Sequence, residues 1–286
     1  MAMRLDRFGT LYIANPLQRR GASKKGHIPI LMYHSISDDP EPGTRPYYRT
    51  ATTPAIFTEH MAYLHQNGYT TIGPKDAAKR LTNDASAETS KVAVITFDDG
   101  FLDFYTHAFP VLQRYGFKAI VYLPTGFIDA SRTSFKGKEC MTWNEVRELH
   151  RHGMLFGSHT VSHPQLHDLN RLSIEQEVGQ SKQTIEQNLG ASADSFAYPY
   201  AFPDADSDFK ASLHGILSDA GYKDGVCTTI GRAERGRDPF FMKRLPINSS
   251  DDSRLFQAKL AGSYDWLARP QYLAKLAKRW VGSGRH

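Results

Sequence analysis

The sequence has few cysteines and no long apolar run. Only Cys140 and Cys227 occur among the 286 residues, and no Cys-x-x-Cys pair is present. This excludes a disulfide framework. No stretch approaches the roughly 20 apolar residues that a membrane-spanning helix needs. The first twenty residues carry early charges and no continuous apolar core, unlike a secretory signal. These absences predict a cytoplasmic protein.

Charge of one sign is also scarce in the central part of the chain. The formal net charge is +5, and much of the excess lies in the end segments "QRRGASKKGH" and "KLAKRWVGSGRH". A nucleic-acid role would need a basic stripe or a recognisable module, and neither occurs. Anionic lipid or an anionic polymer stays an alternative partner for the basic ends.

Short β-rich runs alternate with helix-length amphipathic segments from residue 28 onward. This order predicts an α/β protein with a mainly parallel sheet. Because there are seven or eight repeats and no glycine-rich phosphate loop, a closed (β/α) barrel in a single domain is favoured over an open sheet. The runs are 28–34, 69–72, 92–97, 118–123, 154–159, 195–200, 224–229 and 242–247, and the helices are expected at 54–68, 103–116, 142–153, 173–190 and 207–221.

Polar or ionisable side chains close four of these runs. They are His34, the pair Asp98-Asp99, the pair Ser158-His159 and the segment Tyr198-Pro199-Tyr200. The carboxyl ends of barrel strands open onto one face, where active sites of such barrels lie. We therefore expect these side chains to share one site.

A metal site is the second expectation. His159 and His163 stand four residues apart in "GSHTVSHP", a spacing that lets two imidazoles meet one ion if the segment curls like a helical turn. An aspartate from "VITFDDG" would complete a His-His-carboxylate set and leave its neighbour free to accept a proton. Taken alone, HxxxH is more often a pair of surface or core histidines, and DDG is usually a turn. His167 is a further candidate ligand, although one aspartate of this pair would already complete the set.

The motifs "TFDDG" and "SHTVSHP" together resemble the polysaccharide deacetylases, the NodB-homology domain of carbohydrate esterase family 4. The segments "IPILMYHSIS", "FTEHMAYLHQNGYTTI", "KAIVYLPTGFI" and "FAYPYAFPD" are also similar, so the likeness covers about residues 28–250. The resemblance implies a distorted (β/α) barrel of seven or eight strands. It implies that Asp98 is the catalytic base and that Asp99, His159 and His163 bind a divalent metal, most often Zn²⁺, with Co²⁺ or Ni²⁺ as alternatives.

The third motif departs from the family pattern. Family members commonly carry Arg-x-Pro-Tyr/Phe there, and this chain has Ala197 in the arginine position. Pro199 and Tyr200 match, which implies that the backbone N–H of Tyr200 helps to bind the oxyanion. A charge partner for Asp98 must come from elsewhere, and Arg244 in "MKRLPI" is our candidate. The alternative is that Arg244 is a surface charge.

A late Leu-x-x-His motif, which supplies a general acid in many members, is absent after residue 244. His34 in "MYHSI" ends the first strand instead. Together with "AYPY", it resembles the branch that de-N-acetylates β-1,6-linked N-acetylglucosamine polymers, and this resemblance implies that His34 is the acid. An imidazole suits proton donation near neutral pH. Alternatively, His34 only caps the barrel rim.

The implied function is hydrolysis of N-acetyl groups on amino sugars of a poly- or oligosaccharide, by attack of a metal-bound water on the acetamide. Two alternatives stay open. One is a carbohydrate-binding protein without turnover, which the missing arginine and late histidine would explain. The other is a hydrolase of a non-sugar amide on the same scaffold.

The two ends of the chain form separate expected regions. Residues 1–27 are a basic extension, 28–250 the deacetylase domain, and 251–286 a basic amphipathic helical segment. A basic amphipathic helix can lie on a membrane surface, or it can dock on the barrel or on another subunit. The segment interleaves aromatic and aliphatic residues with cations, namely Trp266, Leu267, Tyr272, Leu273, Leu276 and Trp280 with Arg269, Lys275, Lys278 and Arg279. The sequence does not predict the oligomeric state.

Overall fold

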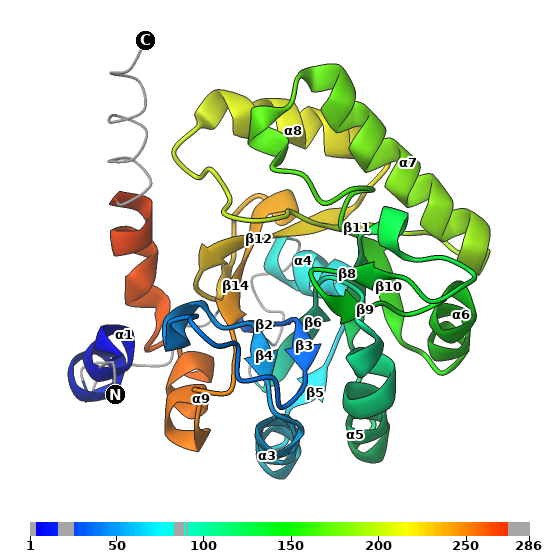
Figure 1. Cartoon of the computed structure of the whole chain (residues 1–286). Helices are drawn as coiled ribbons and strands as arrows, with labels where there is room; N and C mark the ends of the chain where they lie inside the picture. Colours follow the sequence, from blue (N-terminus) through cyan, green and yellow to red (C-terminus); the bar gives the residue numbers. More distant parts are fainter. Residues whose placement is uncertain (1–3, 17–25, 83–88, 90, 274–286) are drawn as a thin grey trace.

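A computed structural model describes residues 4–16, 26–82, 89 and 91–273. Its centre is a closed ring of parallel strands that follow one another in chain order (Figure 1). Pairing of Leu245 with Leu31 closes the ring between the last strand and the first. The ring strands are β2 (Ile30–Tyr33), β6 (Val92–Phe97), β7 (Ile120–Leu123), β10 (Leu155–Ser158), β11 (Ser195–Ala197), β12 (Asp224–Ile230) and β14 (Met242–Pro246). The predicted (β/α) barrel is confirmed, with seven strands.

The ring strands are buried on both faces, as parallel strands covered by helices require. All six residues of β6 are buried. Successive residues point to opposite faces, so Val94 and its register partner Ile30 join one apolar cluster, while Ile95 and Leu31 join another. The apolar runs of the sequence are therefore long enough to fill two layers of core.

The predicted run at 69–72 forms a strand outside the ring. Its strand β5 (Thr70–Thr71) pairs only with Val92 and Ala93 at the start of β6. Three further two-stranded pairs lie outside the ring: β1 (His27–Ile28) with β13 (Ala233–Glu234), β3 (Ser35–Ile36) with β4 (Ala51–Thr52), and β8 (Ser134–Phe135) with β9 (Lys138–Glu139).

Helices surround the ring, and the predicted ones form within a few residues of their expected limits (Figure 1). Thr142 and Glu145 make a capping box at the start of α6, and Gly190 ends α7 in the left-handed conformation. The sequence did not predict α4. The helices are α3 (Pro54–Gln66), α4 (Pro74–Thr82), α5 (Phe109–Tyr115, after the π-helical turn Phe104–Ala108), α6 (Trp143–Arg151), α7 (Arg171–Leu189), α8 (Ser207–Asp219) and α9 (Ser253–Leu260).

Two described segments near the ends of the chain pack on each other beside the barrel. Helix α1 (Leu5–Phe8) continues as the π-helical segment η1 (Gly9–Ala14) and contacts the segment after α9, where Tyr264 donates a 2.7 Å hydrogen bond to Asp6. The helix predicted over 251–286 is described only as far as Leu273, so Leu276, Lys278, Arg279 and Trp280 lie outside the described residues. Within the described residues, no helix combines the length and apolar character that crossing a bilayer requires.

Candidate active site

Two adjacent aspartates leave the end of β6 in different directions. The Asp98 N–H still donates to Tyr33 O at 3.0 Å, so Asp98 extends the strand by one residue. Asp99 then takes a left-handed conformation with φ of 73°, which is uncommon for a residue other than glycine. Each carboxylate is 2% exposed. The turn at Asp99 therefore separates two carboxylates that one strand brings to the same place.

Arg244 holds Asp98 through a buried, two-pronged ion pair. The guanidinium nitrogen Nη1 lies 2.7 Å from Asp98 Oδ1, and Nη2 lies 2.8 Å from Asp98 Oδ2. Two further hydrogen bonds fix the guanidinium itself. Nε donates to Cys227 O at 3.1 Å, and Nη1 donates to Thr96 Oγ1 at 3.2 Å. Arg244 is fully buried and is no surface charge. It reaches Asp98 from β14. Strand β2 lies between β14 and β6, the strand that Asp98 follows.

The two histidines of the second motif meet Asp99. Nε2 of His163 lies 3.3 Å from Asp99 Oδ1, and Nε2 of His159 lies 3.7 Å from the same oxygen. His159 Nδ1 donates to Ala197 O at 2.8 Å, which leaves its Nε2 with a lone pair facing Asp99. The segment is a loop that curls back, with Thr160 and His163 both at positive φ.

Glu177 on α7 anchors this loop from outside. Its carboxylate accepts from the Val161 N–H at 2.8 Å, from the Ser162 N–H at 2.9 Å and from Ser162 Oγ at 2.6 Å. These contacts fix the backbone between the two histidines. Sequence reasoning missed Glu177, because nothing in its helix distinguishes it from a surface glutamate.

Burial and neighbouring charge set the protonation states in the cluster. Burial alone would raise the pKa of Asp98, but Arg244 and the imidazoles of His159 and His34 hold that pKa below its ordinary value. Burial likewise opposes ionisation of Asp99, yet its hydrogen bond with His163 and the nearby imidazoles keep its pKa well below the usual range. Burial lowers the pKa of His159 to about 4, although Asp98 favours the charged form. The site thus holds two carboxylates and a neutral imidazole at neutral pH.

His34 and Tyr200 complete the set that the sequence brought forward. His34 Nε2 lies 3.9 Å from Asp98 Oδ2, and the His34 side chain is 20% exposed. Burial lowers the pKa of His34 from its ordinary value, against the effect of Asp98. The Tyr200 ring lies edge-on against His163, with 4.5 Å between the ring centroids. The backbone N–H of Tyr200 has no hydrogen-bond acceptor among the described residues.

A lysine that the sequence did not single out also reaches the cluster. Lys136 sits at the turn of the β8–β9 hairpin, where Lys136 and Gly137 both have positive φ. Its Nζ lies 3.2 Å from Asp99 Oδ2, and it also faces the rings of Phe135 and Tyr200. The short strands around it lack any alternation, so only the turn residues Lys-Gly could have marked this hairpin.

These residues open onto a cavity of about 490 Å³. His34, Asp98 and Tyr200 line it. So do Asp99, His159 and His163. Asp39 and Glu41 also lie on its wall. His167 is not part of it, and its Nε2 pairs with Asp206 at 3.2 Å instead.

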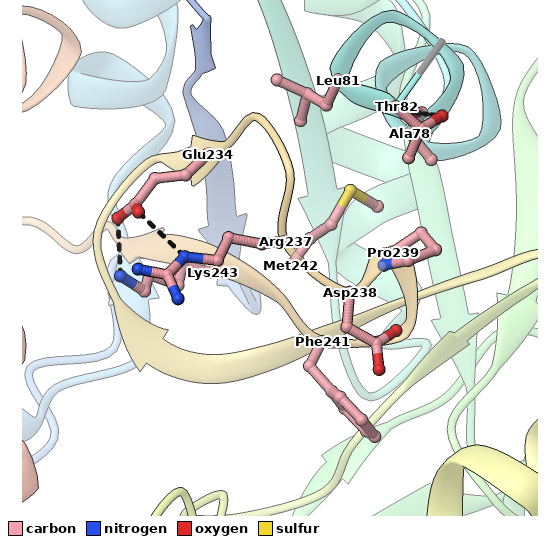
Figure 2. A pocket seen from close by; sticks show the side chains of 10 residues that line it. All are labelled: Ala78, Leu81, Thr82, Glu234, Arg237, Asp238, Pro239, Phe241, Met242 and Lys243. Atoms are coloured by element: carbon pink, nitrogen blue, oxygen red, sulfur yellow. Dashed lines mark hydrogen bonds and ion pairs between the residues drawn. The ribbon is translucent and has the colours of Figure 1, made fainter.

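A second hollow beside the start of β14 has no such chemistry (Figure 2). It measures about 30 Å³, room for about one water molecule. Three of its charged side chains pair with one another, since Glu234 binds Lys243 at 2.7 Å and Arg237 at 3.3 Å, and Asp238 pairs with His214 at 2.8 Å. We assign it no function.

The residues Asp99, His159 and His163 fit a metal ion. Their ligand atoms lie within 4.8 Å of one another, and all three side chains are buried. Ligand atoms arranged tetrahedrally at zinc–ligand distances of about 2.0–2.2 Å are about 3.3–3.6 Å apart. The separations of 3.3 and 3.7 Å from Asp99 Oδ1 match that spacing. Two imidazoles and a carboxylate form a donor set that leaves a position open for water and substrate.

Comparisons with known proteins agree with this geometry. A sequence profile of the family described as "Polysaccharide deacetylase" matches residues 85–222. The Bacillus subtilis (strain 168) protein named "Putative polysaccharide deacetylase YxkH" is 31% identical over 236 residues, which cover 82% of this chain and 76% of that protein. The "Poly-beta-1,6-N-acetyl-D-glucosamine N-deacetylase" of Escherichia coli (strain K12) is 29% identical over 140 residues, 46% of this chain but only 20% of that protein.

Solved structures show the same barrel. The Streptococcus pyogenes deacetylase PplD, in complex with acetate, superposes with a TM-score of 0.69 and 26% identity, over 82% of this chain and 98% of that one. IcaB from Ammonifex degensii gives a TM-score of 0.68 at 22% identity, over 83% and 98% of the two chains, a likeness of fold. The resemblance expected from "TFDDG" and "SHTVSHP" is confirmed, and the chain belongs to the polysaccharide deacetylase family.

Proposed function

We propose that this protein is a metal-dependent hydrolase that removes N-acetyl groups from N-acetylated amino sugars, with β-1,6-linked N-acetylglucosamine chains as the substrate class. One observation carries the proposal. Asp98 is an ionised carboxylate that the metal-fitting cluster does not need, and it lies beside that cluster on the cavity wall. The β-1,6 linkage is supported by the name of the Escherichia coli relative and by His34 at the end of β2.

Asp98 acts as the proton acceptor in this proposal. A divalent ion, which we take to be Zn²⁺, would bind at Asp99, His159 and His163, where it polarises the acetamide carbonyl and lowers the pKa of water. Asp98 takes a proton from the attacking water as its oxygen bonds to the carbonyl carbon. Arg244 keeps Asp98 ionised and directs its oxygens, and the free N–H of Tyr200 donates to the developing oxyanion.

The leaving amine needs a proton when the carbon–nitrogen bond breaks. His34 is our candidate donor, because it lines the cavity and lies 3.9 Å from Asp98 Oδ2. The proton that Asp98 gains from water can pass across this gap to His34 and then to the amine. The products are acetate and a free amino sugar, and the site returns to its starting protonation.

The binding-only alternative rested on Ala197 in place of an arginine and on the missing late histidine. The first reason is weakened, because Arg244 supplies a guanidinium to Asp98 from another strand. A protein that only binds sugar has no need for an oriented, ionised carboxylate beside a metal cluster.

The test is acetate release from defined substrates by the purified protein with added Zn²⁺ or Co²⁺. The panel holds β-1,6- and β-1,4-linked N-acetylglucosamine oligomers, and also small cyclic amides, whose hydrolysis is followed by ring opening because they release no acetate. We expect turnover of the β-1,6 oligomers that a chelator abolishes and Zn²⁺ restores. Turnover of cyclic amides alone would support a non-sugar hydrolase, and binding of oligomers without acetate release would support the binding protein. Either result would contradict the proposal.

A further inference from the structure

The helical segment at the start of the chain exposes its apolar side. Leu5, Phe8, Tyr12 and Ile13 are between 50% and 70% exposed, whereas Asp6 and Thr10 are buried. The Phe8 and Tyr12 rings lie 5.2 Å apart on this outer side. A helix on the surface of a globular protein normally turns its apolar stripe inward. Here only Leu11 is turned inward and buried, and the four outward side chains leave an apolar surface without a partner in the described part of the chain.

Three polar contacts, of which the one to Asp6 is buried, fix this orientation. Asp6 accepts from Tyr264 Oη, Trp266 Nε1 donates to Thr10 Oγ1 at 3.1 Å, and Arg7 pairs with Asp252 at 2.6 Å. Gly9 lies against the Trp266 ring, where a Cβ atom would come within 2.9 Å of a ring carbon. The segment is therefore docked through Asp6, Thr10 and Leu11, and its other apolar side chains are held outward.

The C-terminal segment contacts this one and also exposes apolar side chains. Figure 1 shows α1 beside the orange-red segment that follows α9, and the contact of Trp266 with Thr10 joins the two. Among the described residues, ten large apolar side chains are exposed, and seven of them belong to these two segments. We name these seven the terminal apolar patch: Leu5, Phe8, Tyr12, Ile13, Trp266, Tyr272 and Leu273.

We propose that the terminal apolar patch is a peripheral membrane-binding surface for anionic lipid. Phenylalanine, tyrosine and tryptophan mixed with aliphatic side chains suit the boundary between headgroups and acyl chains. Arg269 is exposed within the patch, and the sequence continues beyond it with Lys275, Lys278, Arg279 and Arg285 and no acidic residue. Cations beside apolar side chains complement an anionic membrane. The negative headgroups attract the cations, and the apolar side chains enter the membrane interface.

The test uses the full chain and sedimentation with vesicles of phosphatidylcholine, with or without about one third phosphatidylglycerol. We expect the wild-type protein to sediment with the anionic vesicles and far less with the neutral ones. The triple variant Leu5→Ser, Phe8→Ser, Ile13→Ser should bind at least about tenfold more weakly, since three apolar side chains no longer enter the bilayer. Its thermal unfolding and acetate release should match those of the wild-type protein, because these side chains are exposed and do not line the cavity.

Leu172 and Tyr48 provide matched controls, since they are 65% and 67% exposed outside the patch. Leu172→Ser and Tyr48→Ser should sediment like the wild-type protein. The proposal is overturned if the wild-type protein does not bind anionic vesicles or if the triple variant binds as tightly. It is also overturned if light scattering shows a wild-type dimer that the triple variant loses, because a second copy would then cover the patch.

Discussion

One buried guanidinium controls the charge and direction of Asp98. In place of the arginine expected at Ala197 on β11, Arg244 reaches the carboxylate from β14 with two parallel hydrogen bonds. Such a fork suits both oxygens of a carboxylate, which a lysine cannot do. The ion pair is therefore restored from a different strand.

Replacing Arg244 tests this at the residue scale. Arg244→Met should lower the free energy of unfolding by about 3–5 kcal/mol, because it leaves Asp98 buried without a partner. Turnover should also fall, since Asp98 loses the charge that keeps it ionised. Chemical denaturation and acetate release measure the two effects.

Arg232 supplies a control, because it is a buried arginine that pairs with Asp265 at 3.0 Å away from the cavity. Arg232→Met should cost stability and leave the turnover of the folded protein unchanged. Wild-type turnover in Arg244→Met would show that Asp98 does not depend on this pair.

At the scale of elements, a loop and a helix cooperate to place His163. The loop has two residues at positive φ, which is a costly conformation for side chains other than glycine. Glu177 on α7 supplies three hydrogen bonds to that loop, so the helix stabilises a backbone that would otherwise relax.

Removing this support should weaken metal binding without touching a ligand. Glu177→Ala should raise the dissociation constant for Zn²⁺ or Co²⁺ about tenfold, measured by calorimetry. Glu175→Ala is the matched control on the same helix, since Glu175 makes only an exposed ion pair with Arg171. Equal affinities for the two variants would mean that the loop keeps its shape without Glu177.

The sequence predicted the elements better than their long-range contacts. Apolar runs and helix caps are local patterns, so the strands and most helices could be predicted. The predicted strand ends also placed His34, Asp98 and His159 at the same end of the barrel. The run at 69–72 could not be separated from the ring strands, because the direct pairing of β2 with β6, which leaves β5 outside the ring, is not encoded locally. Lys136 and Glu177 reach the site through tertiary contacts that no local pattern marks.

At the scale of the whole molecule, a buried acid at the other end of β12 should affect stability. Asp224 is fully buried and accepts from Ser195 Oγ, which also bonds Tyr122 Oη. Burial raises the pKa of Asp224 to about 7, with Asp194 and Asp76 acting in the same sense and Lys75 opposing them. Folding therefore favours the protonated acid.

The stability contribution of Asp224 should decline as pH rises. Between about pH 4 and pH 7 the folded protein holds this proton, whereas the unfolded chain has released it. The free energy of unfolding therefore falls by about 4 kcal/mol over that window. Asp224→Asn should remove this slope, and its stability advantage over the wild-type protein should grow from pH 4 to pH 7. Denaturation at several pH values measures it, and parallel pH profiles for the two proteins would contradict the assignment.

The most direct test of the central claim compares Asp98→Asn with the wild-type protein on a β-1,6-linked N-acetylglucosamine oligomer, with metal content measured in the same samples. We predict that Asp98→Asn keeps its bound metal and loses turnover by at least about 100-fold, since a general base contributes at least that much. His159→Ala should lose both metal and turnover. Near wild-type acetate release by metal-loaded Asp98→Asn would contradict the account.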